Sequence, residues 1–423
     1  MRRKGDQMRR KGDETMSIPD HEAPQLDLFS SEFKRNAYSL YAQLREQEPV
    51  YRFMLPNGQT AWLITRYEDA QAALKDSRFI KNPHTLLSQE QMDKWTFPML
   101  ERDLLIRNMV ASDPPDHTRL RNLVQKAFTP KMIEELRGRI QEIADTLLDE
   151  IQDKGNMNVM DDFAFPLPII VICEMLGIPA EDRDSFRDWS NAIVRAVHLP
   201  EKIQEALPQI RSFIKYMGQL IEERRNDPDE DLVSSLIQAE TEGEQLTENE
   251  LYSMIFLLIV AGHETTVNLI GNGVFALLQH PEQWEKLKSH PGLISSAVEE
   301  ILRFYGPVEL ASSRWAGEDV PFHEQLIRKG DMIAVALASA NRDEAQFIHP
   351  DRFDITRKNN RHLAFGTGIH HCLGAPLARL EGQIALLTLL RRMPNLRLST
   401  DPGTLQWVPA YVMRGLVELP VQF

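Results

Sequence analysis

The sequence predicts a mainly α-helical fold that carries small β-sheets at its periphery. Apolar residues recur at helical spacing over most of the 423 residues, and one long apolar segment ends just before Pro281. Runs with β-type alternation are short. Since no Gly/Ser-rich linker and no solenoid-type repeat divides the chain, we expect one large domain over residues 21–423.

Residues 1–20 are expected to form a disordered extension outside this domain. The stretch Met1–Asp6 recurs as Met8–Asp13, and so short a duplication at one end is typical of a cloning or start-site artefact. Met16 is then the alternative start. The stretch is basic, but no apolar segment follows it, so it does not match a secretory signal.

The first half of the domain predicts a hairpin and then a series of helices. The hairpin is expected around Asn57-Gly58, and residues 80–112 lack periodicity and predict a long irregular excursion. Helices are expected at 68–75, 117–128, 131–155, 167–176, 182–198, 202–226 and 232–240.

The second half begins with the longest predicted helix. Thr247 and Glu250 fit a capping box, and the helix should reach Gln279, a length of about 45 Å. Its apolar run is interrupted by His263 and Glu264, so we expect a core helix and no membrane anchor. Further helices are expected at 282–288, 293–304 and 373–392, with strands within 308–338 and 396–423.

Composition excludes some classes of function. The net charge of -14, from 48 basic and 62 acidic residues, argues against general nucleic-acid binding. Two cysteines are too few for a disulfide framework, so a reducing cytoplasm is expected. Cys173 lies in an apolar run and should be buried, which leaves Cys372 as the candidate for chemistry.

Three interpretations compete for the stretch "FGTGIHHCLG" around Cys372. A dinucleotide fingerprint fails because position 371 is histidine where a third glycine is required. A zinc site is geometrically poor because the adjacent His370, His371 and Cys372 point in different directions in an extended loop. A single thiolate ligand at a helix N-terminus, with glycines that let a flat group approach, is the third interpretation.

This stretch resembles the haem-binding loop of the cytochrome P-450 monooxygenases. The matching positions are Phe365, Gly366, Gly368, His370, Cys372 and Gly374. The resemblance implies haem b (iron protoporphyrin IX) with Cys372 as its axial thiolate and metal ligand, dioxygen as co-substrate, and a long central helix that crosses the haem.

Three further motifs resemble the same family. "AGHETT" resembles its oxygen-activation segment, which implies that Glu264 and Thr265 supply protons and that Ala261 lies against the haem; tight helix packing is the other explanation for Ala261 and Gly262. "EEILR" and "HPDRFD" imply a structural cluster. Its predicted members are Glu300, Arg303 and Arg352. The propionate ligands implied are His117, Arg121, Arg314 and His370.

The resemblance also implies a substrate pocket and an electron donor. The pocket residues implied are Leu257, Val260, Ala261, Leu310 and Val412. We expect hydroxylation of a C–H bond in a medium-sized apolar polyketide, terpenoid or fatty-acid-like molecule. The chain lacks flavin and Fe–S motifs, so a ferredoxin with its reductase, or a flavodoxin, should supply two electrons to a cytoplasmic monomer.

The segment His117–Arg139 carries six Lys or Arg against two acids and would steer an acidic donor; a helix with a basic face is the plain alternative. Two other functions stay open. A haem-binding sensor would not need Glu264 and Thr265, and a peroxide-driven haem enzyme usually lacks such an acid–threonine pair.

Overall fold

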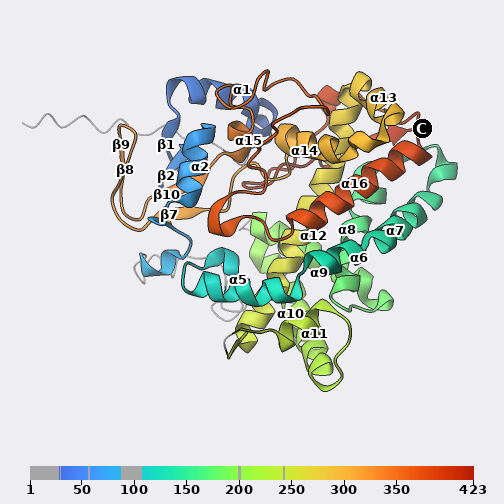
Figure 1. Cartoon of the computed structure of the whole chain (residues 1–423), viewed down its shortest axis with the longest axis horizontal. Coiled ribbons are helices and arrows are strands. Elements are labelled where there is room, and N and C mark those ends of the chain that lie inside the picture. Colours follow the sequence, from blue (N-terminus) through green and yellow to red (C-terminus); the bar gives the residue numbers. More distant parts are fainter. Residues whose placement is uncertain (1–27, 29, 56–57, 87–106, 199–201, 242) are drawn as a thin grey trace, which may run out of the picture.

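The computed structural model describes residues 28, 30–55, 58–86, 107–198, 202–241 and 243–423. The extension predicted at residues 1–20, and most of the excursion predicted at 80–112, therefore lie outside the described residues. In the part described, helices dominate and short strands lie toward the edges of the molecule (Figure 1). The predicted mainly α-helical class is confirmed.

The largest sheet has five strands in the order β1-β2-β10-β7-β3. β1 and β2 are antiparallel, as predicted for the hairpin, while β10 runs parallel to β2. The bounds are β1 Val50–Met54, β2 Thr60–Ile64, β3 Phe79–Ile80, β7 Arg314–Ala316 and β10 Met332–Val335. Helix α2, Tyr67–Lys75, shares a hydrophobic cluster with this sheet.

Smaller sheets use segments that are distant in sequence. The strand β12 lies between β11 and β4, so the last described strand pairs with residues that follow the helix Arg137–Asp149. The strands are β4 Asn156–Asn158, β5 Glu240–Thr241, β6 Glu244–Gln245, β8 Val320–Phe322, β9 Gln325–Ile327, β11 Arg397–Leu398 and β12 Pro420–Gln422.

Helices form most of the remaining regular structure in the described chain. They are α1 Ser31–Gln47, α5 Asp116–Ala127, α6 Pro130–Glu135, α7 Arg137–Asp149, α8 Pro166–Met175, α9 Arg183–His198, α10 Ile203–Asn226, α11 Leu232–Gln238, α12 Glu248–Gln279, α13 Pro281–Ser289, α14 Ile294–Tyr305, α15 Leu337–Ala340 and α16 Ala375–Arg392. One predicted helix, at 131–155, is wrong as a single element. Leu136 closes α6 with a tight turn onto the Ile133 carbonyl at 3.2 Å, and α7 starts anew.

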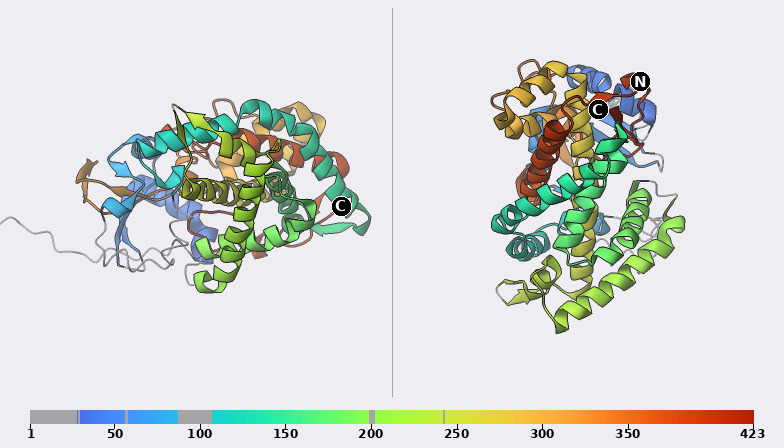
Figure 2. Two further views of the ribbon diagram at one scale, coloured as in Figure 1. Left: turned by 90° about the horizontal axis from the view of Figure 1, so that it is seen from below. Right: turned by 90° about the vertical axis from the view of Figure 1, so that its right-hand side faces the viewer.

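Helix α12 runs through the middle of the helical part and contacts α8, α14 and α16 (Figures 1 and 2). Its predicted capping box is present: the Glu250 N–H donates to the Thr247 hydroxyl, and the Glu250 carboxylate accepts from the Thr247 N–H at 2.8 Å. By length and composition alone α12 could cross a membrane. However, 61% of its most apolar window is buried inside the protein, as expected for a core helix.

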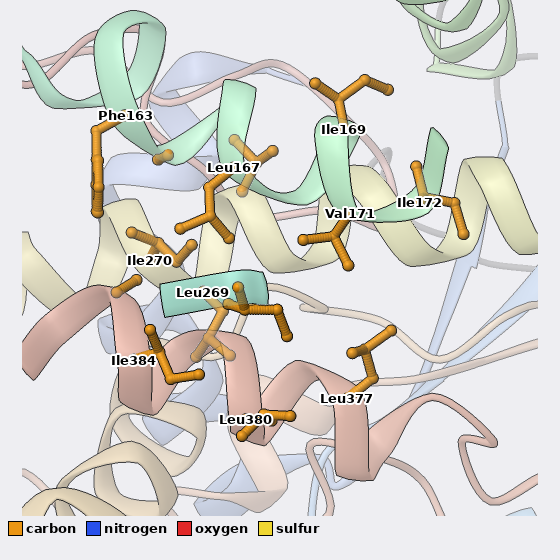
Figure 3. Packing of buried hydrophobic residues seen from close by; sticks show 14 of the residues in the cluster. Phe163, Leu167, Ile169, Val171, Ile172, Leu269, Ile270, Leu377, Leu380 and Ile384 are labelled. Carbon is orange, nitrogen blue, oxygen red and sulfur yellow. The ribbon is translucent and has the colours of Figure 1, made fainter. Parts of the chain in front are cut away.

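The hydrophobic core lies where α8, α12 and α16 meet. Figure 3 shows Leu167 and Val171 of α8 beside Leu269 of α12, with Leu380 and Ile384 of α16 opposite. This packing fixes α16, and therefore the loop that precedes it, against the centre of α12.

Candidate active site

The loop that precedes α16 carries Cys372 at its end. Gly366 and Gly368 have positive φ of 67° and 74°, a backbone conformation that side chains other than glycine rarely adopt. A Cβ atom on Gly368 would also come within 3.2 Å of the Leu74 carbonyl oxygen. The Phe365 carbonyl accepts the Cys372 N–H at 2.9 Å and closes the loop. The two glycines are therefore required by the shape of this turn.

The Cys372 side chain is exposed, and neighbouring protein atoms partly desolvate its sulfur. Desolvation by these atoms raises the pKa of the thiol, while backbone N–H groups of Gly374 and Ala375 and the positive charges of Arg121 and Arg379 lower it. The N–H groups and cations stabilise a thiolate, which is the form of cysteine that binds metals.

A second group of residues, not identified from the sequence, holds the other side of this loop. Arg379 forms a bidentate pair with Glu299, at 2.6 and 2.9 Å, and lies 4.5 Å from the ring centre of Phe365. His362 lies 3.1 Å from the same carboxylate. Although burial acts to raise it, these partners lower the pKa of Glu299 to about 2. Glu299 and Glu300 are adjacent, and nothing in the sequence distinguished the role of one acid from that of the other.

Basic side chains gather around His370 of this loop. The rings of His117 and His370 lie with their centres 4.3 Å apart at an interplanar angle of 60°, and Arg314 and Lys81 are buried nearby. Neither ring nitrogen of His117 has a hydrogen-bond partner of regular geometry within the described residues. Arg121 donates to the carbonyl of His371 at 2.8 Å. The structure therefore brings together all four basic residues predicted at this site and adds Lys81.

These cations repel one another. Burial, together with the charges of His117, Lys81, Arg314 and Arg121, lowers the pKa of His370 to about 3. Burial lowers the pKa of Arg314 to about 10. Such a group of buried basic residues is suited to bind an anionic partner.

Burial lowers the pKa values of Lys81, His117 and Arg314, and the negative charge of Asp113 acts against this shift. Its carboxylate already accepts the backbone N–H groups of Lys81 and Asn82 at 2.9–3.0 Å. The charge of the cluster is thus only partly balanced by the chain.

One face of α12 is open although the helix is otherwise apolar and packed. Ala261 is exposed, and Leu257, Val260, Glu264 and Thr265 are partly exposed. Positions 257, 261, 264 and 265 follow helical spacing, so they share one face. The Thr265 hydroxyl donates to the Ala261 carbonyl at 2.6 Å. A core helix with one open strip fits a flat group that lies against it.

The cluster around Glu300 differs from the prediction in one member. Glu300 and Arg303 are completely buried and form a bidentate pair with both distances at 2.8 Å. The arginine that completes the cluster is Arg357, whose Nε lies 3.0 and 3.1 Å from the Glu300 oxygens. Arg352 was the wrong choice: the chain turns so that its side chain is exposed and only its carbonyl accepts from Arg303 and Arg357.

The five predicted pocket residues divide into two groups. Leu257, Val260 and Ala261 lie on the open strip of α12, and Val412 is partly exposed. Leu310 has 1% exposure, in a cluster with residues of α1 and the five-stranded sheet. A side chain so enclosed offers no surface to a substrate, which argues against the role predicted for Leu310.

These residues fit a cysteine-ligated haem. The Cys372 sulfur accepts hydrogen bonds from N–H groups at the start of α16. The basic cluster at His117, Arg314 and His370 is suited to bind an anion. Helix α12 presents an open apolar strip. Two propionates would supply the missing negative charge, and the strip would face the porphyrin.

Comparison with known proteins gives the same answer. The family model described as Cytochrome P450 matches residues 25–290 and 292–409. A protein of Bacillus subtilis strain 168, named Cytochrome P450, is 51% identical over 396 residues, which cover 94% of this chain and 96% of that protein.

A second relative from the same organism is named Polyketide biosynthesis cytochrome P450 PksS. It is 49% identical over 394 residues, which cover 92% of this chain and 96% of that protein. A solved structure of PksS superposes with a TM-score of 0.88 and covers 94% of this chain and 99% of that one, at 46% identity. The chain therefore belongs to the cytochrome P450 family, and it is a monooxygenase that holds haem through a cysteine thiolate and uses dioxygen.

Proposed function

We propose that this P450 hydroxylates an unactivated C–H bond in a medium-sized apolar molecule of the polyketide class. The open strip of α12 carries the proposal, because apolar Leu257 and Val260 there adjoin Glu264 and Thr265. A pocket of this character favours an apolar ligand with few polar groups. The name of PksS, which assigns that relative to polyketide biosynthesis, supports the choice of substrate class.

The cofactor we propose is haem b with Cys372 as the axial ligand. His117, Arg121, Arg314 and His370 would hold the propionates. Phe365, Gly366, Gly374 and Ala261 would lie against the porphyrin. When bound, the haem uses dioxygen and two electrons to insert one oxygen atom into the substrate, and the thiolate donates electron density that favours O–O cleavage.

In this proposal Thr265 and Glu264 manage protons. Thr265 is partly exposed on the open strip. Its hydroxyl donates to the Ala261 carbonyl at 2.6 Å, and the oxygen of a hydroxyl that donates can still accept a hydrogen bond from water. Glu264, one residue earlier and partly exposed, would pass protons toward it. Glu264 and Thr265 follow Ala261 by three and four positions, so both side chains lie next to Ala261 on the strip.

A separate protein must supply the electrons, as the relatives imply for this family. We propose a ferredoxin or a flavodoxin that docks on the face beside Cys372. Arg121 reaches that face, since it donates to the His371 carbonyl at 2.8 Å. An acidic donor would complement the positive charge there.

Two measurements test this function. The CO-bound reduced protein should show the red-shifted Soret band of a thiolate-ligated haem, and Cys372→His should lose that band while retaining haem. With a surrogate ferredoxin system and a polyketide macrolactone as substrate, Thr265→Ala should consume NADPH yet form several-fold less product per electron. Normal coupling in Thr265→Ala would rule out its proton-delivery role, and Thr266→Ala serves as the matched control.

A further inference from the structure

Four buried polar residues form a cluster outside the site described above. The Lys34 ammonium and the Glu309 carboxylate lie 2.7 Å apart, and neither side chain has exposed surface. The Tyr41 hydroxyl donates to the other Glu309 oxygen at 2.9 Å. Arg414, 2% exposed, donates to the Lys34 carbonyl at 3.0 Å. This cluster joins α1, the segment after α14 and the C-terminal tail.

Stability alone does not explain this cluster. Taking two charges out of water costs much of what their attraction returns, and apolar residues of similar volume often serve as well. The cost is visible here: burial lowers the pKa of Lys34 and raises the pKa of Tyr41. Hydrogen-bonded charges add a directional constraint that apolar packing lacks, because each hydrogen bond requires a defined geometry of its donor and acceptor.

The geometry that the cluster fixes is that of the tail around Val412. Lys34 donates to the Met413 carbonyl at 3.1 Å, and the Arg414 N–H donates to the Pro307 carbonyl at 2.8 Å. The Val412 carbonyl accepts the N–H groups of Glu309 and of the following residue, at 2.8 and 3.3 Å. The tail is thereby held along the segment that contains Glu309.

The same tail also packs against α12. Asn272 donates to the Arg414 carbonyl at 2.9 Å, and a Cβ on Gly415 would come within 1.9 Å of the Asn268 side-chain oxygen. Asn268 follows Thr265 by three positions and therefore lies on the same face of the helix. The tail thus crosses α12 about one turn beyond Thr265.

We propose that Lys34, Tyr41, Glu309 and Arg414 are positioning residues that set where the tail around Val412 lies relative to the open strip of α12, and thereby select substrates by shape. The inference rests on the proposed function, since it assumes that substrate binds along the open strip of α12. The cluster contacts no substrate and no cofactor, and it acts only through the tail. Helix α1 would then influence selectivity, although its residues Lys34 and Tyr41 are far in sequence from those of the strip.

Two tyrosines of α1 offer a matched test. Tyr41→Phe removes one hydrogen bond to Glu309 and leaves the ring in place. Tyr38→Phe is the control, because the Tyr38 hydroxyl donates to the Phe304 carbonyl at 3.1 Å and not to the cluster. The probes are imidazole, a small ligand of haem iron, and 4-phenylimidazole, whose ring must fit against the wall of the pocket. Both dissociation constants are read from the shift of the Soret band.

Loss of one such bond should change the ratio of the two dissociation constants by about 3-fold or more in Tyr41→Phe. The imidazole constant and the CO spectrum should stay as in the wild type. Hydrogen exchange at the amides of Glu309, Leu310 and Arg414 should quicken. Tyr38→Phe should leave the ratio and these amides unchanged, and Val412→Ala should change the ratio directly.

The double variant Lys34→Met/Glu309→Gln removes the charges of Lys34 and Glu309 together, while Arg414 keeps its hydrogen bond to the carbonyl of residue 34, and the variant should change the ratio in the same direction. Faster exchange with an unchanged ratio in both variants would mean that the cluster only stabilises the fold, and the inference would be wrong. A wild-type protein without the thiolate-type CO band would refute the proposed function itself. A normal band with an unaffected ratio defeats the positioning role alone.

Discussion

Glu300 is a carboxylate with no exposed surface that accepts from two arginines at once. Arg303 binds it in bidentate fashion at 2.8 Å, and Arg357 adds contacts at 3.0 and 3.1 Å. Arg357 also donates to the carbonyls of Ile348 and Arg352, both at 2.8 Å. One side chain therefore ties α14 to the segment that leads toward Cys372.

Removing Arg357 should be costly, whereas removing Arg352 should not. Arg357→Met leaves a buried acid with one fewer counter-charge and frees several carbonyls, so we expect a loss of about 3 kcal/mol in the free energy of unfolding. Arg352→Met keeps the backbone carbonyl that is used, and should stay within about 0.5 kcal/mol. Thermal unfolding of the two haem-loaded variants compares them. Equal losses would show that our assignment of the third member is mistaken.

Glu381, on α16, is a buried acid with a different environment. It is 2% exposed, and its Oε2 atom has no hydrogen-bond partner within the described residues. Burial raises the pKa of Glu381 to about 8. The native state therefore keeps a proton that the unfolded chain releases above about pH 4.

This difference makes stability fall as the pH rises. Between about pH 4 and pH 8 the native state binds more protons than the unfolded chain, so each pH unit costs up to about 1.4 kcal/mol. Glu381→Gln has no proton to lose and should gain stability over the wild type between pH 5 and pH 8. Denaturation at pH 5, 6.5 and 8 measures this, with the exposed Glu324→Gln as control. Parallel pH profiles for wild type and Glu381→Gln would contradict the buried neutral acid.

At the scale of elements, α12 meets its neighbours through small residues and buried amides. Gly415 of the tail lies where a Cβ would collide with the Asn268 oxygen at 1.9 Å. Asn272 donates to the carbonyls of Tyr305 and Arg414, at 3.0 and 2.9 Å. Polar residues in an apolar helix thus bind the C-terminal end of α14 and the irregular tail, whose carbonyl groups would otherwise be unsatisfied.

Gly415→Ala should lower the free energy of unfolding by about 1–3 kcal/mol, because the added methyl group overpacks a filled site. Adding Asn268→Ala makes room and should recover part of that loss, which a double-mutant cycle measures. Gly138→Ala is the control: nothing lies within 4 Å of its Cβ position in α7, so helix propensity should stabilise it by about 1 kcal/mol. Additive effects of Gly415→Ala and Asn268→Ala would exclude the close contact.

At the scale of the whole molecule, the charge is unevenly distributed. The chain carries a net charge of -14, while the segment His117–Arg139 is basic. Much of that basic charge is already used: Arg119 pairs with Glu250, Arg137 with Glu134 at 2.5 Å, and Arg139 with Glu142 and Glu174 at 2.8 and 2.9 Å. The field that steers an acidic donor should therefore be modest.

We expect the rate at which reduced ferredoxin transfers its first electron to fall with added salt, but only several-fold between about 20 mM and 300 mM ionic strength. Lys126→Glu, at an exposed site on α5, should lower the rate at low salt and flatten its salt dependence. Lys154→Glu, outside the basic segment, should not. Stopped-flow kinetics gives both rates. A rate that is independent of salt would exclude electrostatic steering.

Much of the fold and of the reaction class could be predicted because the signals are local. The capping box at Thr247 and Glu250 marks the start of α12, and periodicity locates most other helices, since both depend on residues within one or two turns. The break at Leu136 between α6 and α7 was not predicted, because the apolar period continues across it and only the backbone turn interrupts it.

The sequence by itself determined the helical class, because helical periodicity is local. It also supplied the proposals for Cys372 as the cofactor ligand and for the pair Glu264 and Thr265, because each of these rests on a contiguous motif. Only the tertiary structure decided that Arg357 replaces Arg352, that Glu299 and Arg379 hold the cysteine loop, and that Leu310 is enclosed. Only it joined Lys34 to Glu309 and Arg414. These contacts depend on which way a backbone turns and on which distant segments pack together, and the free energy that selects them is summed over the whole chain.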